Sequence, residues 1–213
     1  MSRIGNLFVR FRPGPAPRAE PDTDASRWVV AGLGNPGEEY RRSRHNVGFM
    51  AAAHLAARHR IELNRRKFSG LYAETAIAGA SALIVTPQTF YNRSGDCLAS
   101  LTGYFKVPVE KLIVIHDEID LPLRQMRIKR GGGDAGNRGV RSIAAALGPD
   151  FIRVRVGVGH PGAAADAIDH VLKPLTASEM RELEPTLDRV IEAVTVLIGE
   201  GLERAMSIFN QQV

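Results

Sequence analysis

The chain has 213 residues, of which 44% are hydrophobic and 24% are charged, a balance typical of a soluble globular protein. No uninterrupted apolar stretch approaches the roughly 18 residues that a membrane-spanning helix needs. The single cysteine, Cys97, excludes an internal disulfide framework and a multi-cysteine zinc site, which suits a protein of the reducing cytoplasm. The net charge is +5, and basic residues gather in the middle of the chain. This clustering predicts a polyanionic partner, with nucleic acid as the first candidate. The alternative is a basic face that contacts only solvent.

The first 26 residues differ in composition from the rest of the chain. Arg and Pro alternate there, and the first acidic residue is Glu20. We expect a disordered extension or an overlong gene start, with an organelle presequence as the alternative. The folded domain is therefore placed at residues 27–213.

Apolar runs and turn residues predict strands and helices that alternate along the chain. Strands are expected at 28–33, 71–77, 82–85, 111–116, 125–129 (an edge strand) and 151–158; helices are expected after Asn46, which can cap the first, and at 94–105 and 139–147. The C-terminal third is helical from a capping box of Thr176 and Glu179, and Pro185 predicts a kink or a restart within it. The expected fold is a single α/β domain with a mostly parallel mixed β-sheet surrounded by helices.

A glycine-rich turn follows the first predicted strand. Its spacing, Gly32-x-Gly34-x-x-Gly37, matches a dinucleotide-binding fingerprint. However, Pro36 removes a backbone donor that a pyrophosphate needs, and the next helix starts only near Asn46. A nucleotide-binding oxidoreductase is therefore disfavoured.

His45 and Asp117 are candidates for acid–base chemistry. His45 stands at the start of a predicted helix, where the positive end of the helix dipole favours the neutral ring that a general base requires. Asp117 follows a buried strand, and sites in open α/β sheets assemble at such strand ends. Its carboxylate could bind one ring nitrogen and leave the other free for a water. For each residue alone, a capping histidine or a turn aspartate is the alternative.

Two loop carboxamides, Asn35 and Asn92, could hold a carbonyl group or a water beside this pair; turn formation is their alternative role. Covalent catalysis has little support, because no serine lies in a nucleophile elbow and Cys97 lies in a predicted helix without a nearby basic partner. Water activated by His45 and Asp117 is the remaining simple chemistry.

Several motifs stand in a fixed order along the chain. They are GLGNPG at 32–37, RHNVG at 44–48, PQTFYNRSG at 87–95, HDEIDLP at 116–122, a glycine-rich loop, and RVGVGHP at 155–161. Over about residues 28–211 the chain thereby resembles bacterial-type peptidyl-tRNA hydrolase. The resemblance implies a cytoplasmic monomer that cleaves the ester between a stalled peptide and tRNA, without metal or cofactor, and a mostly parallel mixed sheet surrounded by helices.

The resemblance also implies roles for individual residues. His45 matches the catalytic base, Asp117 the carboxylate that orients it and supports its protonated form, and Asn35 the residue that recognises the blocked, peptide-like amine. The residues that match groups around the peptide and the tRNA acceptor end are Tyr40, Phe90 and Asn92. Lys129 and Arg155 match the pair that clamps a tRNA phosphate.

Two positions depart from the family pattern. Tyr91 stands where the family usually carries Met, a change expected to alter the pocket wall but not the proton chemistry. Residues 136–139 read Gly-Asn-Arg-Gly in place of Gly-His-Asn-Gly, so Arg138 replaces an asparagine that holds a water and the acceptor end. Arg has only donors and cannot accept a bond from that water, but it could hold a phosphate or ribose.

Two functions from different classes follow. The leading hypothesis is an esterase acting on peptidyl-tRNA, because the acid–base pair and both carboxamides are present. The alternative is a catalytically weakened, hydrolase-like RNA-binding protein, which Arg138 and the N-terminal extension favour.

Overall fold

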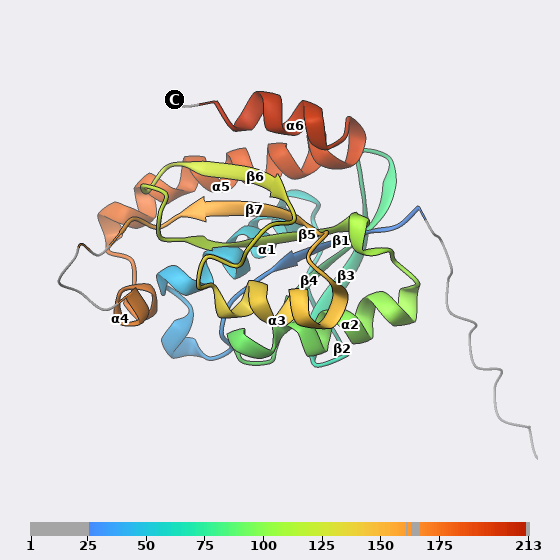
Figure 1. Cartoon of the computed structure of the whole chain (residues 1–213), viewed down its shortest axis with the longest axis horizontal. Helices are drawn as coiled ribbons and strands as arrows, with labels where there is room; N and C mark the ends of the chain where they lie inside the picture. The colour runs from blue at the N-terminus through green and yellow to red at the C-terminus, as the bar shows by residue number, and fades with distance from the viewer. Residues whose placement is uncertain (1–25, 161, 163–166, 212–213) are drawn as a thin grey trace, which may run out of the picture.

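The computed structural model describes residues 26–160, 162 and 167–211, and a mixed β-sheet lies at its centre (Figure 1). Its strands are β1 (Trp28–Gly32), β2 (Arg65–Lys67), β3 (Gly70–Ile77), β4 (Ala80–Pro87), β5 (Leu112–Glu118), β6 (Met126–Arg130) and β7 (Ile152–Gly157). They are ordered β2-β3-β4-β1-β5-β7-β6. The central strands β4, β1, β5 and β7 pair in parallel, whereas β2, β3 and β6 form antiparallel pairs at the two sides. The predicted α/β fold is confirmed.

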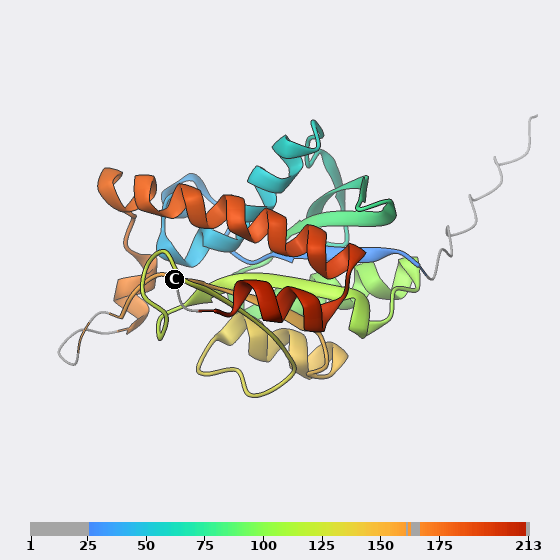
Figure 2. The same cartoon turned by 90° about the horizontal axis from the view of Figure 1, so that it is seen from above.

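Helices cover both faces of this sheet (Figures 1 and 2). They are α1 (Val47–Arg58), α2 (Ser94–Phe105), α3 (Arg138–Leu147), α4 (Ala167–Leu172), α5 (Ala177–Gly199) and α6 (Leu202–Phe209). Along β5, Ile113 and Ile115 pack with α1, α5 and α6, while Leu112 and Val114 pack on the other face with α2 and α3. Because successive strand residues point to opposite faces, the part of β5 that is covered on both sides, residues 112–115, is apolar at every position.

Most of the predicted elements are present. The helix at 94–105 is α2, and the expected edge strand is β6, the last strand of the sheet. Strand β5 continues past its predicted end through Asp117 and Glu118, because these residues pair with Val156 and Gly157 of β7. Strand β2 was not predicted, because its three residues are exposed and charged and show no apolar pattern. The predicted N-terminal extension lies, apart from Ser26, outside the described residues.

Asn46 is the N-cap residue of α1, as predicted, but its side chain makes no cap bond to the helix. The Asn46 side chain instead accepts a hydrogen bond from the backbone N–H of Asn35 at 2.8 Å and donates one to the Asn35 carbonyl at 2.9 Å. It therefore fixes the glycine-rich loop after β1. The start of α1 also lies against the sheet, because a Cβ on Gly48 would come within 2.4 Å of the Leu33 nitrogen and the Ile115 oxygen.

Helix α5 begins with the predicted capping box of Thr176 and Glu179. It then continues through Pro185 to Gly199, so the restart considered for this position is wrong. Buried Leu183 and Leu187 on either side of the proline hold the helix against α1 and the sheet, which offsets the missing backbone donor. Across the described segments, no helix combines the length and the apolar character that a membrane span requires.

Candidate active site

A cavity of about 390 Å³ lies at the carboxyl ends of the parallel strands. Asn35 reaches it from the loop after β1, Tyr91 from the short 3-10 helix η3 (Tyr91–Arg93) after β4, and Asp117 from the end of β5. His45 reaches it from the 3-10 helix η2 (Arg44–Asn46) that precedes α1. Other lining residues are Phe90, Asn92, Glu118, Asn137, Arg138, Ile168 and Leu172. The sheet topology thus collects residues that are far apart in the sequence.

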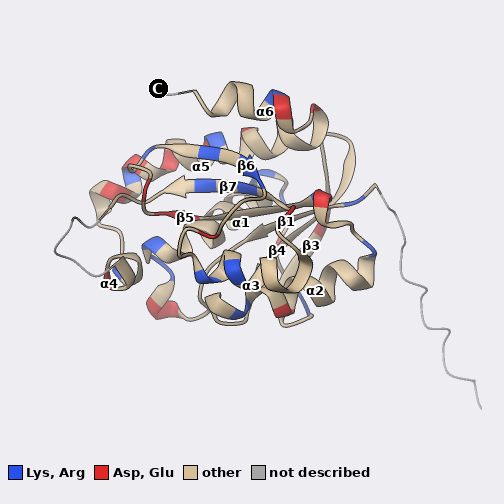
Figure 3. Cartoon of the chain, in the orientation of Figure 1, with Lys and Arg blue, Asp and Glu red and all other residues tan. Residues whose placement is uncertain are grey.

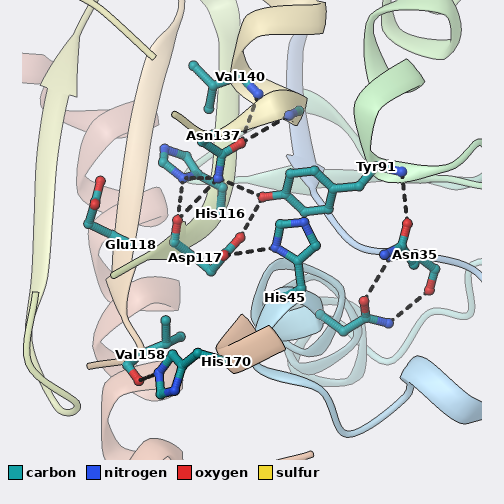
Figure 4. Close-up of polar contacts among 12 residues, drawn as sticks. Asn35, His45, Tyr91, His116, Asp117, Glu118, Asn137, Val140, Val158 and His170 are labelled. Atoms are coloured by element: carbon teal, nitrogen blue, oxygen red, sulfur yellow. Dashed lines mark hydrogen bonds and ion pairs between the residues drawn. The ribbon is translucent and has the colours of Figure 1, made fainter. Parts of the chain in front are cut away.

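His45 and Asp117 form a hydrogen-bonded pair in this cavity (Figure 4). The distance from His45 Nδ1 to Asp117 Oδ2 is 2.9 Å, and only 4% of the Asp117 side chain is exposed. Burial acts to raise the pKa of Asp117, but the charge of His45 and hydrogen bonds from His45 and Tyr91 outweigh it, and the pKa lies below its usual value. An ionised carboxylate accepts a proton donor, so Nδ1 carries the proton and Nε2 is left as the acceptor.

Tyr91 contacts both members of this pair. Its ring stacks on the His45 imidazole, with ring centroids 3.5 Å apart and planes 15° from parallel. Its hydroxyl donates a 2.5 Å hydrogen bond to Asp117 Oδ1. Burial and the charge of Asp117 hold the pKa of Tyr91 well above its usual value, so the phenol keeps its proton. The expectation that Tyr91 changes only the pocket wall is therefore wrong, because the hydroxyl is bonded directly to the carboxylate that orients the base.

The two predicted carboxamides are placed differently. Asn35 Oδ1 accepts a hydrogen bond of 2.9 Å from the backbone N–H of Tyr91, which fixes the side chain beside His45 (Figure 4). Its Nδ2 has no hydrogen-bond partner within the described part of the chain. Asn92 lines the cavity with an exposed side chain and likewise makes no hydrogen bond to any described residue. Both amides can therefore donate to a bound molecule.

Of the two aromatic residues predicted to contact the substrate, Phe90 lines the cavity and Tyr40 does not. Phe90 is 63% exposed and lines the cavity together with Ile168 and Leu172 of α4, which are also exposed. This gives the cavity an apolar rim. Tyr40 ends the short 3-10 helix η1 (Glu38–Tyr40), is half-buried, and is not among the residues that line the cavity.

Lys129 and Arg155 lie on the antiparallel strands β6 and β7, and basic positions of the two paired strands lie near each other along the ribbon (Figure 3). Arg155 Nε donates a 2.8 Å bond to Glu118 Oε2, and Glu118 lines the cavity. Burial, together with the charges of Arg153 and Arg155, lowers the pKa of Lys129. Arg153 itself is buried and donates to the carbonyls of Gly132 and Gly133, both at 2.7 Å. Arg155 is thus linked to the cavity through Glu118, which follows Asp117 in β5.

Known proteins share both this sequence and this architecture. The family model described as peptidyl-tRNA hydrolase matches residues 29–213. The chain belongs to the peptidyl-tRNA hydrolase family. It is 43% identical to the peptidyl-tRNA hydrolase of Carboxydothermus hydrogenoformans, over 86% of this chain and 98% of that one, and 46% identical to that of Frankia casuarinae, over 86% and 93%. The crystal structure of the peptidyl-tRNA hydrolase from Acinetobacter baumannii superposes with a TM-score of 0.82 at 33% identity, covering 87% of this chain and 95% of that one.

The family's glycine-rich segment takes a distinct form in this chain. Asn137 enters the site: its Nδ2 donates to the Tyr91 hydroxyl at 3.0 Å, and its Oδ1 accepts from the backbone N–H groups of Gly139 and Val140, capping α3. Sequence reasoning overlooked Asn137, although an asparagine before a predicted helix is a capping signal. Arg138 is exposed at the cavity and has no hydrogen bond or ion pair to the described residues.

Other chemistries receive little support from the described residues. Cys97 is buried, and burial raises its pKa to about 12, so it is a poor nucleophile. No group of three His, Cys, Asp or Glu side chains among the described residues is arranged to hold a metal. After Gly37 the chain enters η1, and α1 begins only at Val47, which agrees with the rejection of a dinucleotide-binding turn.

Proposed function

We propose that this chain hydrolyses the ester bond between peptide and tRNA in peptidyl-tRNA, with a water molecule activated by His45. The observation that carries the mechanism is the 2.9 Å bond from His45 Nδ1 to the buried Asp117, which leaves Nε2 as the proton acceptor at the cavity. Family membership gives the reaction and also supports the expected cytoplasmic location.

The reaction needs one base and no covalent intermediate. His45 Nε2 takes a proton from water as the water oxygen attacks the ester carbonyl carbon. The imidazolium is stabilised by Asp117, and when the bond to the ribose oxygen breaks, the same proton passes to that oxygen. The products are a tRNA with a free terminal hydroxyl and a peptide carboxylic acid, which releases the second water proton to solvent.

The carboxamides and the apolar rim account for substrate placement. The free Nδ2 of Asn35 can donate to a peptide carbonyl next to the ester, and Asn92 can donate to the water or to the oxyanion that forms. The exposed side chains of Phe90, Ile168 and Leu172 offer contact to the peptide. Tyr40, outside the cavity lining, is assigned to the more distant part of the substrate.

The basic strands account for binding of the nucleic acid. Lys129 and Arg155 together are suited to one phosphate of the tRNA, and Glu118 orients Arg155 without neutralising Lys129. We further propose that the chain acts as a monomer and without a cofactor. Light scattering of the free chain and of its tRNA complex tests the monomer.

The experiment that tests the function is release of the acyl group from N-acetyl-aminoacyl-tRNA by the purified chain. Free aminoacyl-tRNA is the control, because its unblocked amine lacks the peptide-like carbonyl that Asn35 would recognise. We expect rapid release from the blocked substrate only. Equal release from both substrates would contradict the proposed recognition.

Arg138 is the observation that favours the second candidate, an RNA-binding protein with weakened catalysis. Under the hydrolase proposal, Arg138 grips a phosphate or ribose, so Arg138→Asn weakens tRNA binding by about tenfold while single-turnover hydrolysis of bound substrate is kept or rises. Under the second candidate, the wild-type chain binds tRNA but hardly turns over at saturating substrate. Single-turnover rates measured beside tRNA affinity separate the two.

A further inference from the structure

Tyr91 occupies the centre of the site without being part of the expected machinery. It is 3% exposed and lies between His45 and the start of α3. Its ring is nearly parallel to the imidazole at 3.5 Å between centroids. A ring held so close on one face restricts rotation of the imidazole and keeps Nδ1 directed at Asp117.

The Tyr91 hydroxyl belongs to a continuous chain of hydrogen bonds (Figure 4). Asn137, fixed by the backbone of α3, donates to the hydroxyl at 3.0 Å, and the hydroxyl donates to Asp117 Oδ1 at 2.5 Å. The other carboxylate oxygen, Oδ2, accepts from His45. The carboxylate thus has two donors, one neutral and one that becomes charged during the reaction.

Local backbone geometry is built to admit this tyrosine. A Cβ on Gly139 would come within 2.4 Å of the Tyr91 ring, so the glycine makes room for the aromatic side chain. The backbone N–H of Tyr91 also holds Asn35 Oδ1 at 2.9 Å. A single residue therefore contacts the base, its carboxylate and the neighbouring carboxamide.

We propose that Tyr91 is a positioning residue for the general base: its ring fixes the imidazole plane, and its hydroxyl draws negative charge away from the side of Asp117 that faces His45. This inference rests on the proposed function. A carboxylate that already accepts a hydrogen bond from a phenol stabilises the imidazolium less, so loss of the hydroxyl is expected to favour protonation of His45 and to narrow the pH range in which the base is active.

The charge of His116 also contributes to lowering the pKa of Asp117, whereas the other titratable and charged groups around the pair have partners of their own or do not reach the carboxylate. On β5, His116 Nδ1 lies 2.8 Å from the carbonyl of Asp117, and Glu118 is paired with Arg155 of β7. The remaining pairs are Arg44 of η2 with Glu179, Arg93 of η3 with Asp96, and His170 of α4 with the Gly159 carbonyl. Arg138 of α3 and Asp169 of α4 are exposed and have no contact with Asp117. Among the described residues, Tyr91 is the uncharged side chain that donates to a carboxylate oxygen of Asp117, so loss of its hydroxyl changes the carboxylate without changing net charge.

Tyr91→Phe tests the hydroxyl, because it keeps the ring and the stack. We expect the acid limb of the kcat/KM profile to move to higher pH by about half a unit, because only part of the roughly one-unit effect of a lost hydrogen bond on Asp117 passes on to His45, with KM within about twofold of wild type. Tyr91→Met removes ring and hydroxyl together, and we expect kcat to fall by about tenfold or more at neutral pH. Tyr104→Phe is the matched control, because Tyr104 is 39% exposed and lies in an aromatic cluster with Phe68 and Phe105; its pH profile should equal that of wild type.

NMR titration of the His45 ring in wild type and Tyr91→Phe gives a readout that does not depend on turnover. A higher titration midpoint in Tyr91→Phe supports the inference even if the wild-type chain proves inactive, in which case the proposed function alone fails. An unchanged midpoint, or an unchanged acid limb in an active and normally folded Tyr91→Phe, overturns the role of Tyr91.

Discussion

The two carboxylate oxygens of Asp117 accept hydrogen bonds from different residues. One of these two contacts could be predicted from the sequence, and the other could not. Oδ2 accepts from His45, a contact expected because the strand end and the helix start meet at one edge of the sheet. Oδ1 accepts from Tyr91, a contact that no local pattern indicates because it depends on how η3 and α3 approach each other. The bond from Asn137 to the Tyr91 hydroxyl depends on the same approach, although the cap that Asn137 forms on α3 has a signal in the sequence.

Asp117→Asn tests the charge that supports the base. The amide keeps the size of the side chain but can present a donor to Nδ1, which turns the ring into the wrong tautomer. We expect kcat to fall by about 10²- to 10⁴-fold with little change in tRNA affinity.

Asp188→Asn is the matched control for this change, because Asp188 also pairs with a histidine, His54, at 2.9 Å but on the exposed surface. Its activity should equal that of wild type. Full activity in Asp117→Asn would remove the carboxylate from the mechanism.

At the scale of elements, the site depends on how closely α1 approaches the ends of β1 and β5. Gly48 permits that approach, and the backbone N–H of Phe49 donates to the Leu33 carbonyl at 3.1 Å. Since η2 leads directly into α1, the position of His45 follows that of the helix. Asn46 stands at the N-cap of α1 as predicted, but the loop after β1 competes for its side chain, so the expected cap bond is not made.

Gly48→Ala tests this packing. The added Cβ meets backbone atoms at 2.4 Å, so α1 must move, and we expect the free energy of unfolding to fall by about 2–4 kcal/mol and kcat to fall with it. Gly103→Ala in α2 is the control, because nothing lies within 4 Å of its added Cβ and alanine favours a helix. Urea denaturation gives the stability of both variants, and turnover gives their activity. Equal stability of Gly48→Ala and wild type would contradict the tight packing of α1 against β1 and β5.

Lys129 and Arg155 lie on the paired strands β6 and β7, and their positive charges lead to a prediction about the salt dependence of tRNA binding. Lys129→Ala and Arg155→Ala should each weaken tRNA binding and reduce the slope of log affinity against log salt by about one, since each removes one phosphate contact. Hydrolysis of bound substrate should survive.

Arg130→Ala controls for loss of a positive charge on the same strand. Arg130 is adjacent to Lys129, so alternation along β6 turns it to the other face, where it bonds the Asp150 carbonyl. For Arg130→Ala, the slope of log tRNA affinity against log salt should match that of wild type. A wild-type slope in Lys129→Ala or Arg155→Ala would place the phosphate contact elsewhere.

At the scale of the whole molecule, the parallel strands bring the reacting groups together at their carboxyl ends. The antiparallel pair β6–β7 carries basic residues at one side of the same sheet (Figure 3). The alternation of apolar strands and helices sufficed to predict this architecture, because burial on both faces leaves a continuous apolar run in β1, β4 and β5, while β7 keeps an alternating pattern. Short, charged β2 and the uninterrupted α5 could not be predicted in this way, since pairing with β3 in one case and packing around Pro185 in the other override the local sequence.

The most direct test of the whole account is acyl release from N-acetyl-aminoacyl-tRNA by wild type and His45→Ala, measured beside tRNA binding. We predict brisk release by wild type and a loss of at least about 10²-fold in His45→Ala, the usual cost of removing a general base, with tRNA affinity unchanged. Near-wild-type release by His45→Ala would contradict the account.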